Sequence, residues 1–293
     1  MGPIVNVDWL AARLGAPDLV VVDCRQSAHR KPPGRPTDGW PGTDARGPGF
    51  RLHSDDPVPG AVFLDLESGM CGPVREHGGR HPLPDLGTFS LLAGELGIGN
   101  DTDVVAYDDQ GGAVAARLWW MLTFLGHRRV FVLDGGHAAW KNAGRPAGGH
   151  PPAAASRRFS PRVHTAMMIA ADELRNKLGA PGVVLVDSRE PARFRGEADP
   201  IDGVSGRIPG SINRYWKESL DDRGFFRSPE EQAARFAGIG RDDEVIVYSG
   251  SGVTACVNVL ALRLAGFRNV RLYVGGWSDW ISYGDHPIET GGE

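Results

Sequence analysis

The sequence predicts an α/β protein of two similar domains, each built on a mainly parallel sheet flanked by helices. Three observations indicate this fold class. The chain has 293 residues, and at roughly 150 residues per domain this length suits two domains. Segments of the first half recur in the second half. In both halves, short β-rich apolar runs alternate with stretches of helical spacing.

The internal repeat preserves the order of four segments. The matching pairs are Leu19–Arg25 with Val183–Arg189, Val58–Ala61 with Ile208–Ser211, Leu96–Tyr107 with Ala237–Tyr248, and Val132–Trp140 with Tyr273–Trp280. The separation between partners shrinks along the chain, so the first copy carries extra residues in its early loops. A unit this long indicates a duplicated domain and not a solenoid repeat.

The predicted elements follow the same order in both copies. In the first copy the strands are Leu19–Asp23, Val104–Tyr107 and Arg129–Leu133, and the helices are Trp9–Leu14 and Ala113–Leu125. In the second copy the strands are Val183–Asp187, Glu244–Tyr248 and Val270–Val274, and the helices are Ala170–Leu178, Pro229–Ala237 and Val253–Ala265. This alternation favours right-handed crossovers and parallel sheets that are covered on both faces.

Composition places the domain boundaries. We expect a first domain over residues 1–145, a linker over 146–160 and a second domain over 161–293. The linker region contains Gly, Pro, Ala and Arg without periodicity, which is typical of interdomain segments. Arg25–Pro59 is rich in Pro, Gly and charge and predicts a long irregular loop in the first domain.

The overall composition excludes several classes of protein. Apolar residues make up 41% of the chain and the net charge is −4, with no basic block, which argues against disorder and against a nucleic-acid partner. No apolar run is long enough to span a membrane, and the N-terminus lacks the pattern of a secretory signal. Three cysteines without Cys-x-x-Cys spacing predict neither a disulfide framework nor a metal site. We therefore expect a cytoplasmic protein without a metal or cofactor and without a membrane partner.

The segment most indicative of chemistry follows the strand Glu244–Tyr248. It reads Ser249-Gly-Ser-Gly-Val-Thr-Ala-Cys256, a loop of small residues that leads into a predicted helix. Ligands of open α/β sheets collect at the carboxyl ends of strands. Gly250 and Gly252 allow successive N–H groups to point inward, and the helix N-terminus adds further donors. The loop is therefore expected to hold an anion or to stabilise one formed from its own first side chain.

Three general motifs fit this loop poorly. Gly250–Ala255 matches the loose dinucleotide pattern G-x-G-x-x-A, but no acidic residue follows about 20 positions later. A hydrolase elbow requires Gly two residues before the nucleophilic Ser, and Val247 occupies that position. A phosphatase loop of the form Cys-x5-Arg would need Cys at 249 and Arg at 255, where the chain has Ser and Ala.

Taken together, the motifs resemble the two-domain rhodanese family, in particular the thiosulfate/3-mercaptopyruvate sulfurtransferases. The resemblance rests on the duplicated domain, the Asp-Cys/Ser-Arg strand ends, the Ile208-Pro-Gly turn and the loop Ser249–Ala255. It covers nearly the whole chain and implies two tandem rhodanese-like domains, the second carrying the active loop. The first loop begins Asp108-Asp109-Gln110, and its acidic residues are expected to repel an anion.

The resemblance implies a sulfurtransferase that needs no cofactor. In the family, a loop cysteine takes sulfur from a donor, thiosulfate or 3-mercaptopyruvate, and passes it from a persulfide to a thiol or cyanide. A helix N-terminus suits this chemistry because it lowers the pKa of a thiol. Here the nucleophile position holds Ser249, whose oxygen cannot store sulfur as a persulfide. The chain is thus predicted to be inactive or to carry an introduced Cys-to-Ser replacement, and the fidelity of residues 250–255 favours the latter.

Further site residues are implied position by position. The expected catalytic residues are Ser249, Ser251, Asp65 and His81, and the expected substrate-binding residues are Arg193, Gly250, Gly252, Val253 and Thr254. Simpler interpretations remain open: Asp65 as a capping carboxylate, His81 as a solvated loop residue and Arg193 as a surface arginine. Where the 3-mercaptopyruvate branch often has a second arginine, this chain has Ile201, so the donor is not decided.

Two other functions compete with the enzyme. A rhodanese-fold protein could retain the anion loop as a silent binding or regulatory module. A chain released from catalysis has no reason to keep Ser251, Asp65 and Arg193 together, so the sequence favours the enzyme. A serine hydrolase is a more distant alternative, since no histidine lies near Ser249 in the sequence.

Overall fold

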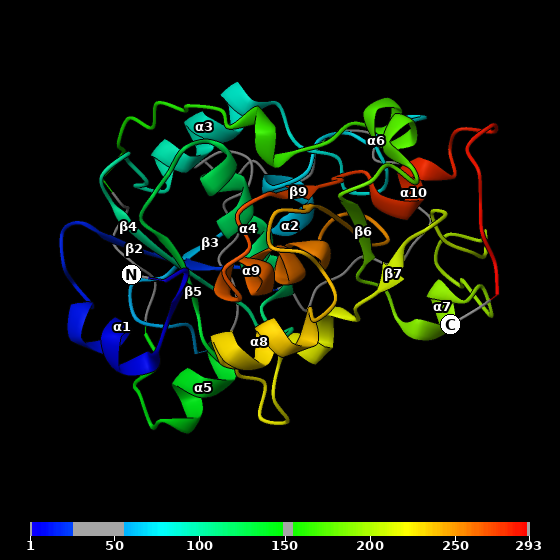
Figure 1. The fold of residues 1–293 in the computed structure, drawn as a ribbon. Coiled ribbons are helices and arrows are strands. Elements are labelled where there is room, and N and C mark those ends of the chain that lie inside the picture. The colour runs from blue at the N-terminus through cyan, green and yellow to red at the C-terminus, as the bar shows by residue number, and fades with distance from the viewer. Residues whose placement is uncertain (1, 26–55, 149–154, 292–293) are drawn as a thin grey trace.

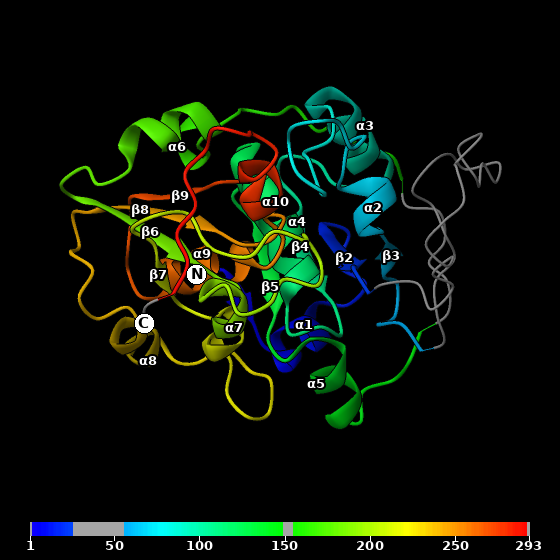
Figure 2. The same ribbon diagram turned by 90° about the vertical axis from the view of Figure 1, so that its right-hand side faces the viewer.

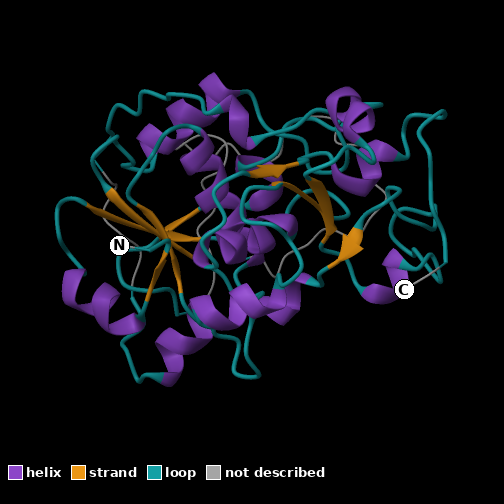
Figure 3. Cartoon of the chain, in the orientation of Figure 1, coloured by secondary structure: helices purple, strands orange, loops and turns teal. Residues whose placement is uncertain are grey.

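The structure is a computed structural model that describes residues 2–25, 56–148 and 155–291. It contains two separate parallel sheets with helices around and between them (Figures 1 and 3). The predicted α/β class and the repeat of a parallel α/β unit are confirmed. Most of the predicted Arg25–Pro59 loop and the centre of the predicted linker lie outside the described residues, and the domain boundaries stay a prediction.

The first sheet has five parallel strands in the order β1-β5-β4-β2-β3. The strands are β1 (Ile4–Val5), β2 (Leu19–Asp23), β3 (Val62–Phe63), β4 (Asp103–Tyr107) and β5 (Val130–Leu133). The helices are α1 (Val7–Arg13), α2 (Leu66–Gly69), α3 (Leu86–Glu95), α4 (Ala113–Phe124) and α5 (Gly136–Asn142).

The second sheet has four parallel strands in the order β7-β6-β8-β9. The strands are β6 (Val183–Asp187), β7 (Ile212–Asn213), β8 (Glu244–Tyr248) and β9 (Val270–Leu272). The helical elements are η1 (Thr165–Met167), α6 (Ala171–Lys177), α7 (Pro191–Phe194), η2 (Trp216–Ser219), α8 (Pro229–Arg235), α9 (Ala255–Leu264) and α10 (Gly276–Trp280). All the strands and helices named from the sequence are present, with ends that differ by no more than two residues.

Helices α4 and α9 form the centre of the molecule (Figures 1 and 2). Both are buried along nearly their whole length, because most of their side chains are apolar. One core cluster runs from strands β2 and β4 through these helices to β6 and β8. Two smaller clusters lie on the outer faces, under α1 and α5 in the first half and under α6 and α10 in the second.

The repeated Asp-x-Arg strand ends form the same buried brace in each half. Arg189, of which 2% is exposed, donates to both carboxylate oxygens of Asp187, with Nη2–Oδ2 at 2.6 Å. Arg25 makes the matching pair with Asp23, also at 2.6 Å. The brace fixes the carboxyl end of the strand beside the one that leads into the loop, where a ligand would bind.

In the described residues, we find no helix that is both long and apolar enough to cross a bilayer. The longest helix, α4, has 12 residues, whereas a span needs about 20.

The buried brace generates a stability prediction. Asp187→Ala leaves the Arg189 guanidinium buried with the loss of its main carboxylate partner, so we expect the free energy of unfolding to fall by about 3–5 kcal/mol. Asp285→Ala is the control, because its ion pair with Arg175 is exposed and is expected to contribute less than about 1 kcal/mol. Urea denaturation of the two variants measures the difference. Equal losses would contradict the role of the brace.

Candidate active site

The loop after β8 is shaped by one obligatory glycine. Gly252 has a φ of +74°, and a Cβ at this position would lie 2.0 Å from the carbonyl oxygen of Val274. The carbonyl of Ser249 accepts a hydrogen bond from the Trp277 N–H at 2.7 Å. The loop is therefore fixed against the turn between β9 and α10, and a larger residue at 252 would displace it.

The backbone N–H groups of this loop are arranged as donors. The Gly252 N–H donates to Ser249 Oγ at 3.1 Å. The N–H groups of Ser251, Val253 and Thr254 donate no hydrogen bond to any residue that the structure describes. They precede α9, whose N-terminus carries the positive end of the helix dipole. Three N–H groups without a described partner beside a helix N-terminus are compatible with the predicted anion binding.

The corresponding loop of the first half already holds an anion, the carboxylate of Asp108. Its Oδ1 accepts the N–H groups of Gln110 and Gly112 at 2.8 Å each. Its Oδ2 accepts those of Val114 at 2.8 Å and Ala115 at 2.9 Å. Burial raises the pKa of Asp108, and the four donors oppose this shift by favouring the charged form. The Asp108 carboxylate thus occupies the N–H groups of this loop. The second acidic residue of the loop, Asp109, is exposed.

A segment of the first half crosses to the loop of the second half. This segment, residues 77–81, is here called the bridging segment. The Gly78 N–H donates to Asp279 Oδ1 at 2.6 Å, and the Arg80 N–H donates to Ser278 Oγ at 3.1 Å. His81 Nδ1 lies 2.7 Å from Ser251 Oγ. The site is therefore assembled from both halves, and His81 and Ser251, each predicted as a site residue, are in hydrogen-bond contact.

A buried arginine supports the bridging segment from below. Arg117 of α4 is fully buried and donates to the His81 carbonyl at 3.1 Å. Its Nε and Nη1 have no hydrogen-bond partner among the described residues. No carboxylate pairs with Arg117 among the described residues. Its positive charge lies close enough to Cys256 to oppose the rise that burial causes in the pKa of this thiol. Burial still raises the pKa of Cys256 to about 12, so this cysteine is a poor substitute nucleophile.

Two arginines lie over Gly250. A Cβ on this glycine would lie 3.2 Å from Arg80 Nη2 and 3.3 Å from Arg193 Nη2. Arg193 is paired with Asp199 at 2.9 Å and with Asp202 at 2.7 Å, and Asp202 also pairs with Arg80. Burial and the charge of Arg193 lower the pKa of Arg80, and Asp199 opposes this shift. The two cations and two carboxylates leave the mouth of the loop without net charge.

Asp65 has a different environment from the one expected. It caps α2, and its Oδ1 accepts the N–H of Ser68 at 2.9 Å and the Ser68 hydroxyl at 2.8 Å. Within the described residues its hydrogen bonds all go to Ser68, so the capping interpretation describes its geometry. A catalytic role for Asp65 stays a prediction.

Three residues of this region were not predicted. Arg80 precedes His81 directly, and Asp202 follows Ile201, so both lay beside predicted positions. Their convergence joins segments more than 100 residues apart, which no local pattern reveals. Arg117 lay inside an apolar helix, and a charge in an otherwise apolar helix was the available signal.

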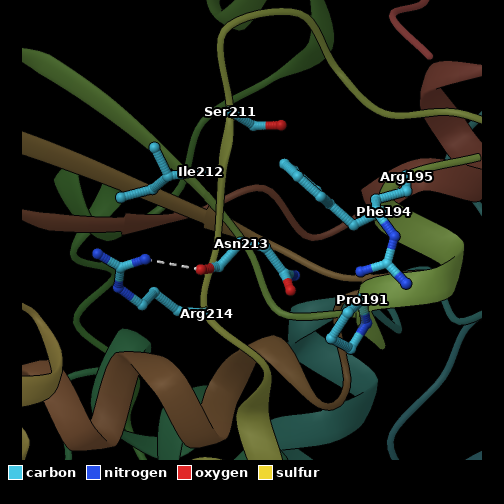
Figure 4. A pocket seen from close by; sticks show the side chains of 7 residues that line it. All are labelled: Pro191, Phe194, Arg195, Ser211, Ile212, Asn213 and Arg214. Atoms are coloured by element: carbon cyan, nitrogen blue, oxygen red, sulfur yellow. Dashed lines mark hydrogen bonds between the residues drawn. The ribbon is translucent and has the colours of Figure 1, made fainter. Parts of the chain in front are cut away.

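A separate pocket of about 370 Å³ lies on α7 and the edge strand β7 (Figure 4). It is lined by Pro191, Phe194, Arg195, Ser211, Ile212, Asn213 and Arg214. Neither Arg193 nor a loop residue belongs to this lining. The pocket is therefore distinct from the predicted substrate site.

In the parts of the chain that the structure describes, no cluster of three His, Cys, Asp or Glu side chains could hold a metal ion.

Comparison with known proteins defines the class. The sequence profile of the rhodanese-like domain matches residues 6–143 and 170–283, one match for each sheet. The crystal structure of SseA from Escherichia coli, described as a 3-mercaptopyruvate sulfotransferase with the rhodanese fold, superposes with a TM-score of 0.73 at 28% identity. The superposition covers 95% of this chain and 100% of that chain. The molecule is a tandem rhodanese.

Sequence relatives identify the branch. The chain is 41% identical over 293 residues to a Pseudomonas aeruginosa protein named "Probable 3-mercaptopyruvate sulfurtransferase", with 98% of each chain covered. It is 31% identical over 313 residues to the Arabidopsis thaliana mitochondrial "Thiosulfate/3-mercaptopyruvate sulfurtransferase 1", with 98% of this chain and 78% of the relative covered. The chain belongs to the two-domain rhodanese family of thiosulfate/3-mercaptopyruvate sulfurtransferases.

The filled loop of the first half generates a rescue prediction. Asp108→Ala removes a carboxylate that four N–H groups share, so we expect the free energy of unfolding to fall by about 2–4 kcal/mol. Added formate is expected to raise the melting temperature of this variant more than that of the unmodified chain, with chloride at the same concentration as the ionic control.

Asp109→Ala is the matched variant, because Asp109 neighbours Asp108 but is exposed. It should lose little stability and respond equally to formate and chloride. If Asp108→Ala behaves in the same way as Asp109→Ala, the carboxylate is not the anion that the loop requires.

Proposed function

We propose that position 249 is the nucleophile position of a sulfurtransferase whose preferred donor is 3-mercaptopyruvate. The observation that carries this proposal is the loop 249–254, where the Gly252 N–H donates to Ser249 Oγ and the N–H groups of Ser251, Val253 and Thr254 have no partner among the described residues. The first-half loop, filled by Asp108, provides the reference for how such donors bind an anion. The name of the Pseudomonas aeruginosa relative supports 3-mercaptopyruvate as the donor, and the name of the Arabidopsis thaliana relative contains both donors.

The proposed reaction needs a cysteine at 249. Its thiolate attacks the donor sulfur, the carbon–sulfur bond breaks, and the electron pair passes to carbon 3 of the donor, which takes a proton to give pyruvate. The terminal sulfur of the resulting persulfide is anionic, and the loop N–H groups and the α9 N-terminus stabilise it. Ser249 cannot form this persulfide, so the chain with Ser249 is proposed to bind donor without turnover.

Two groups of side chains are proposed to carry out proton transfer and donor binding. Ser251, hydrogen-bonded to His81, is proposed to move a proton between donor and solvent. Arg193 and Arg80, which lie over Gly250, are proposed to bind the donor carboxylate. Asp199 and Asp202 hold these arginines in position, and the donor carboxylate has to compete with them.

The acceptor is proposed to be a small thiol, with cyanide as its laboratory substitute. The location in the cell stays predicted as cytoplasmic.

The alternative function is a silent binding module that retains the loop. One observation favours this alternative, namely that Ser249 occupies the nucleophile position in the chain as it stands. The activity of a restored cysteine separates the two.

Restoring the nucleophile is the direct test. Ser249→Cys is expected to raise sulfur transfer from 3-mercaptopyruvate to cyanide by about 1000-fold or more over the unmodified chain, because removing a covalent nucleophile costs at least that much. Thiocyanate formation is measured with 3-mercaptopyruvate and with thiosulfate. The ratio of the two rates identifies the preferred donor.

Ser249→Ala is the control and should be as inactive as the unmodified chain. If Ser249→Cys folds, as judged by its melting temperature, and remains silent with both donors, the enzyme proposal fails. The binding-module alternative then replaces it.

The proton-transfer pair is tested in the Ser249→Cys background. Ser251→Ala is expected to lower the turnover number with 3-mercaptopyruvate by about 100-fold, the usual scale of general acid–base catalysis. Sulfur transfer from thiosulfate releases sulfite and protonates no carbon atom. The turnover number with thiosulfate should therefore fall much less. A uniform loss with both donors would indicate a structural role for Ser251.

The arginine pair is tested in the same background. Arg193→Gln is expected to raise the KM for 3-mercaptopyruvate by about tenfold or more, because a charge-assisted contact to the carboxylate is lost. Arg195→Gln is the matched control at the C-cap of the same short helix, since Arg195 pairs with the exposed Glu197. Equal effects of the two substitutions would contradict the proposed contact.

A further inference from the structure

A groove of about 540 Å³ lies between the two halves, at the end of the molecule opposite the active loop. Its walls come from the end of α4 and the start of β5 in the first half, and from the end of α9, the start of β9 and η1 in the second. The active loop follows the carboxyl end of β8, whereas this groove lies at the amino ends of β5 and β9. It is therefore a separate site on the same interface.

The floor of the groove is apolar. Trp119, Val130 and Val270 are each more than nine-tenths buried in the structure and line it from below, and Met167 covers one side. No aspartate or glutamate is among the residues that line the groove. Pockets for small organic molecules commonly have this volume and combine apolar side chains with a few polar or charged groups.

The rim of the groove is basic. Arg128, Arg263 and Arg268 line it, all three are exposed, and none pairs with a carboxylate within the described residues. Partial burial lowers the pKa of Arg263, and no neighbouring acid opposes the shift. The adjacent Arg129, which does not line the groove, pairs instead with Asp18 and Asp103. Three cations without a carboxylate partner in the described parts of the chain thus converge on one groove that no acidic side chain lines.

The duplication explains how two of the cations converge. Helices α4 and α9 pack against each other and end in the same way, at Gly126 with φ +87° and Gly266 with φ +89°. An arginine stands two residues after each glycine, Arg128 and Arg268. The same helix end therefore presents a cation to the groove from each half. An arginine near the C-terminus of a helix also compensates the helix dipole, which would explain Arg128 and Arg268 individually. It would not explain why apolar side chains line the groove between the two arginines.

We propose that this groove binds a small organic anion with an apolar body, such as an aromatic carboxylate or sulfonate. The apolar floor would bury the body, and the arginines would bind the anionic group. Because both halves contribute, a bound ligand would hold them together. The proposal is independent of the identity of residue 249.

The test is a fluorescence titration of the full chain with 8-anilinonaphthalene-1-sulfonate. The neutral comparison probe is N-phenyl-1-naphthylamine, which has the same ring system without the sulfonate. We expect saturable binding of one sulfonate probe per chain and at least tenfold weaker binding of the neutral probe. Arg128→Gln/Arg268→Gln should weaken binding of the sulfonate probe at least tenfold.

Two further variants make the result specific. Arg75→Gln/Arg158→Gln removes the same charge from two exposed arginines outside the groove and should leave binding unchanged. Ala166→Trp places a bulky ring at the exposed edge of the groove and should block binding without altering the rim charge. Equal affinity of the sulfonate probe for all variants, equal affinity of the two probes, or no saturable binding would each overturn the proposal.

Discussion

The packing of α4 against α9 is the contact on which the rest of the molecule depends. Most side chains of the two helices are apolar, and both helices belong to the core cluster that joins the two sheets. Their contact brings the bridging segment to the loop after β8 at one end and leaves the groove with its three arginines at the other. The geometry of the predicted site is therefore a property of the interface as much as of the loop.

Much of the fold could be read from the sequence, because its signals are local. Buried parallel strands appear as continuous apolar runs, and the duplication presents each pattern twice, so β2, β4, β6 and β8 were predicted almost to the residue. The two-residue strands β1, β3 and β7 are too short for any periodicity, and they form only because a longer strand pairs with them. Helices α2, α3, α5, α7 and α10 were not predicted; of these, α2 and α7 have only four residues each, too few for helical periodicity.

The candidate site was predictable only in part. The loop 249–254 carries its own signal, since its glycines and the following helix start lie in one stretch of sequence. His81 and Arg193 came from the family resemblance, and the structure brings both beside the loop. The charges that surround them could not be read in this way. Arg80 and Asp202 meet across the interface, and the neutrality of the mouth arises from that meeting and not from either segment alone.

The carboxylate of Asp108 distinguishes the two loops by the source of the anion that their N–H groups bind. A loop that carries its anion on its own side chain keeps it at every solute concentration, so the Asp108 loop needs no anion from solution. A loop whose anion comes from solution gains stability in proportion to the logarithm of ligand concentration. One duplicated design thus gives a first loop that carries its own anion and a second loop that, under the proposed function, takes its anion from solution.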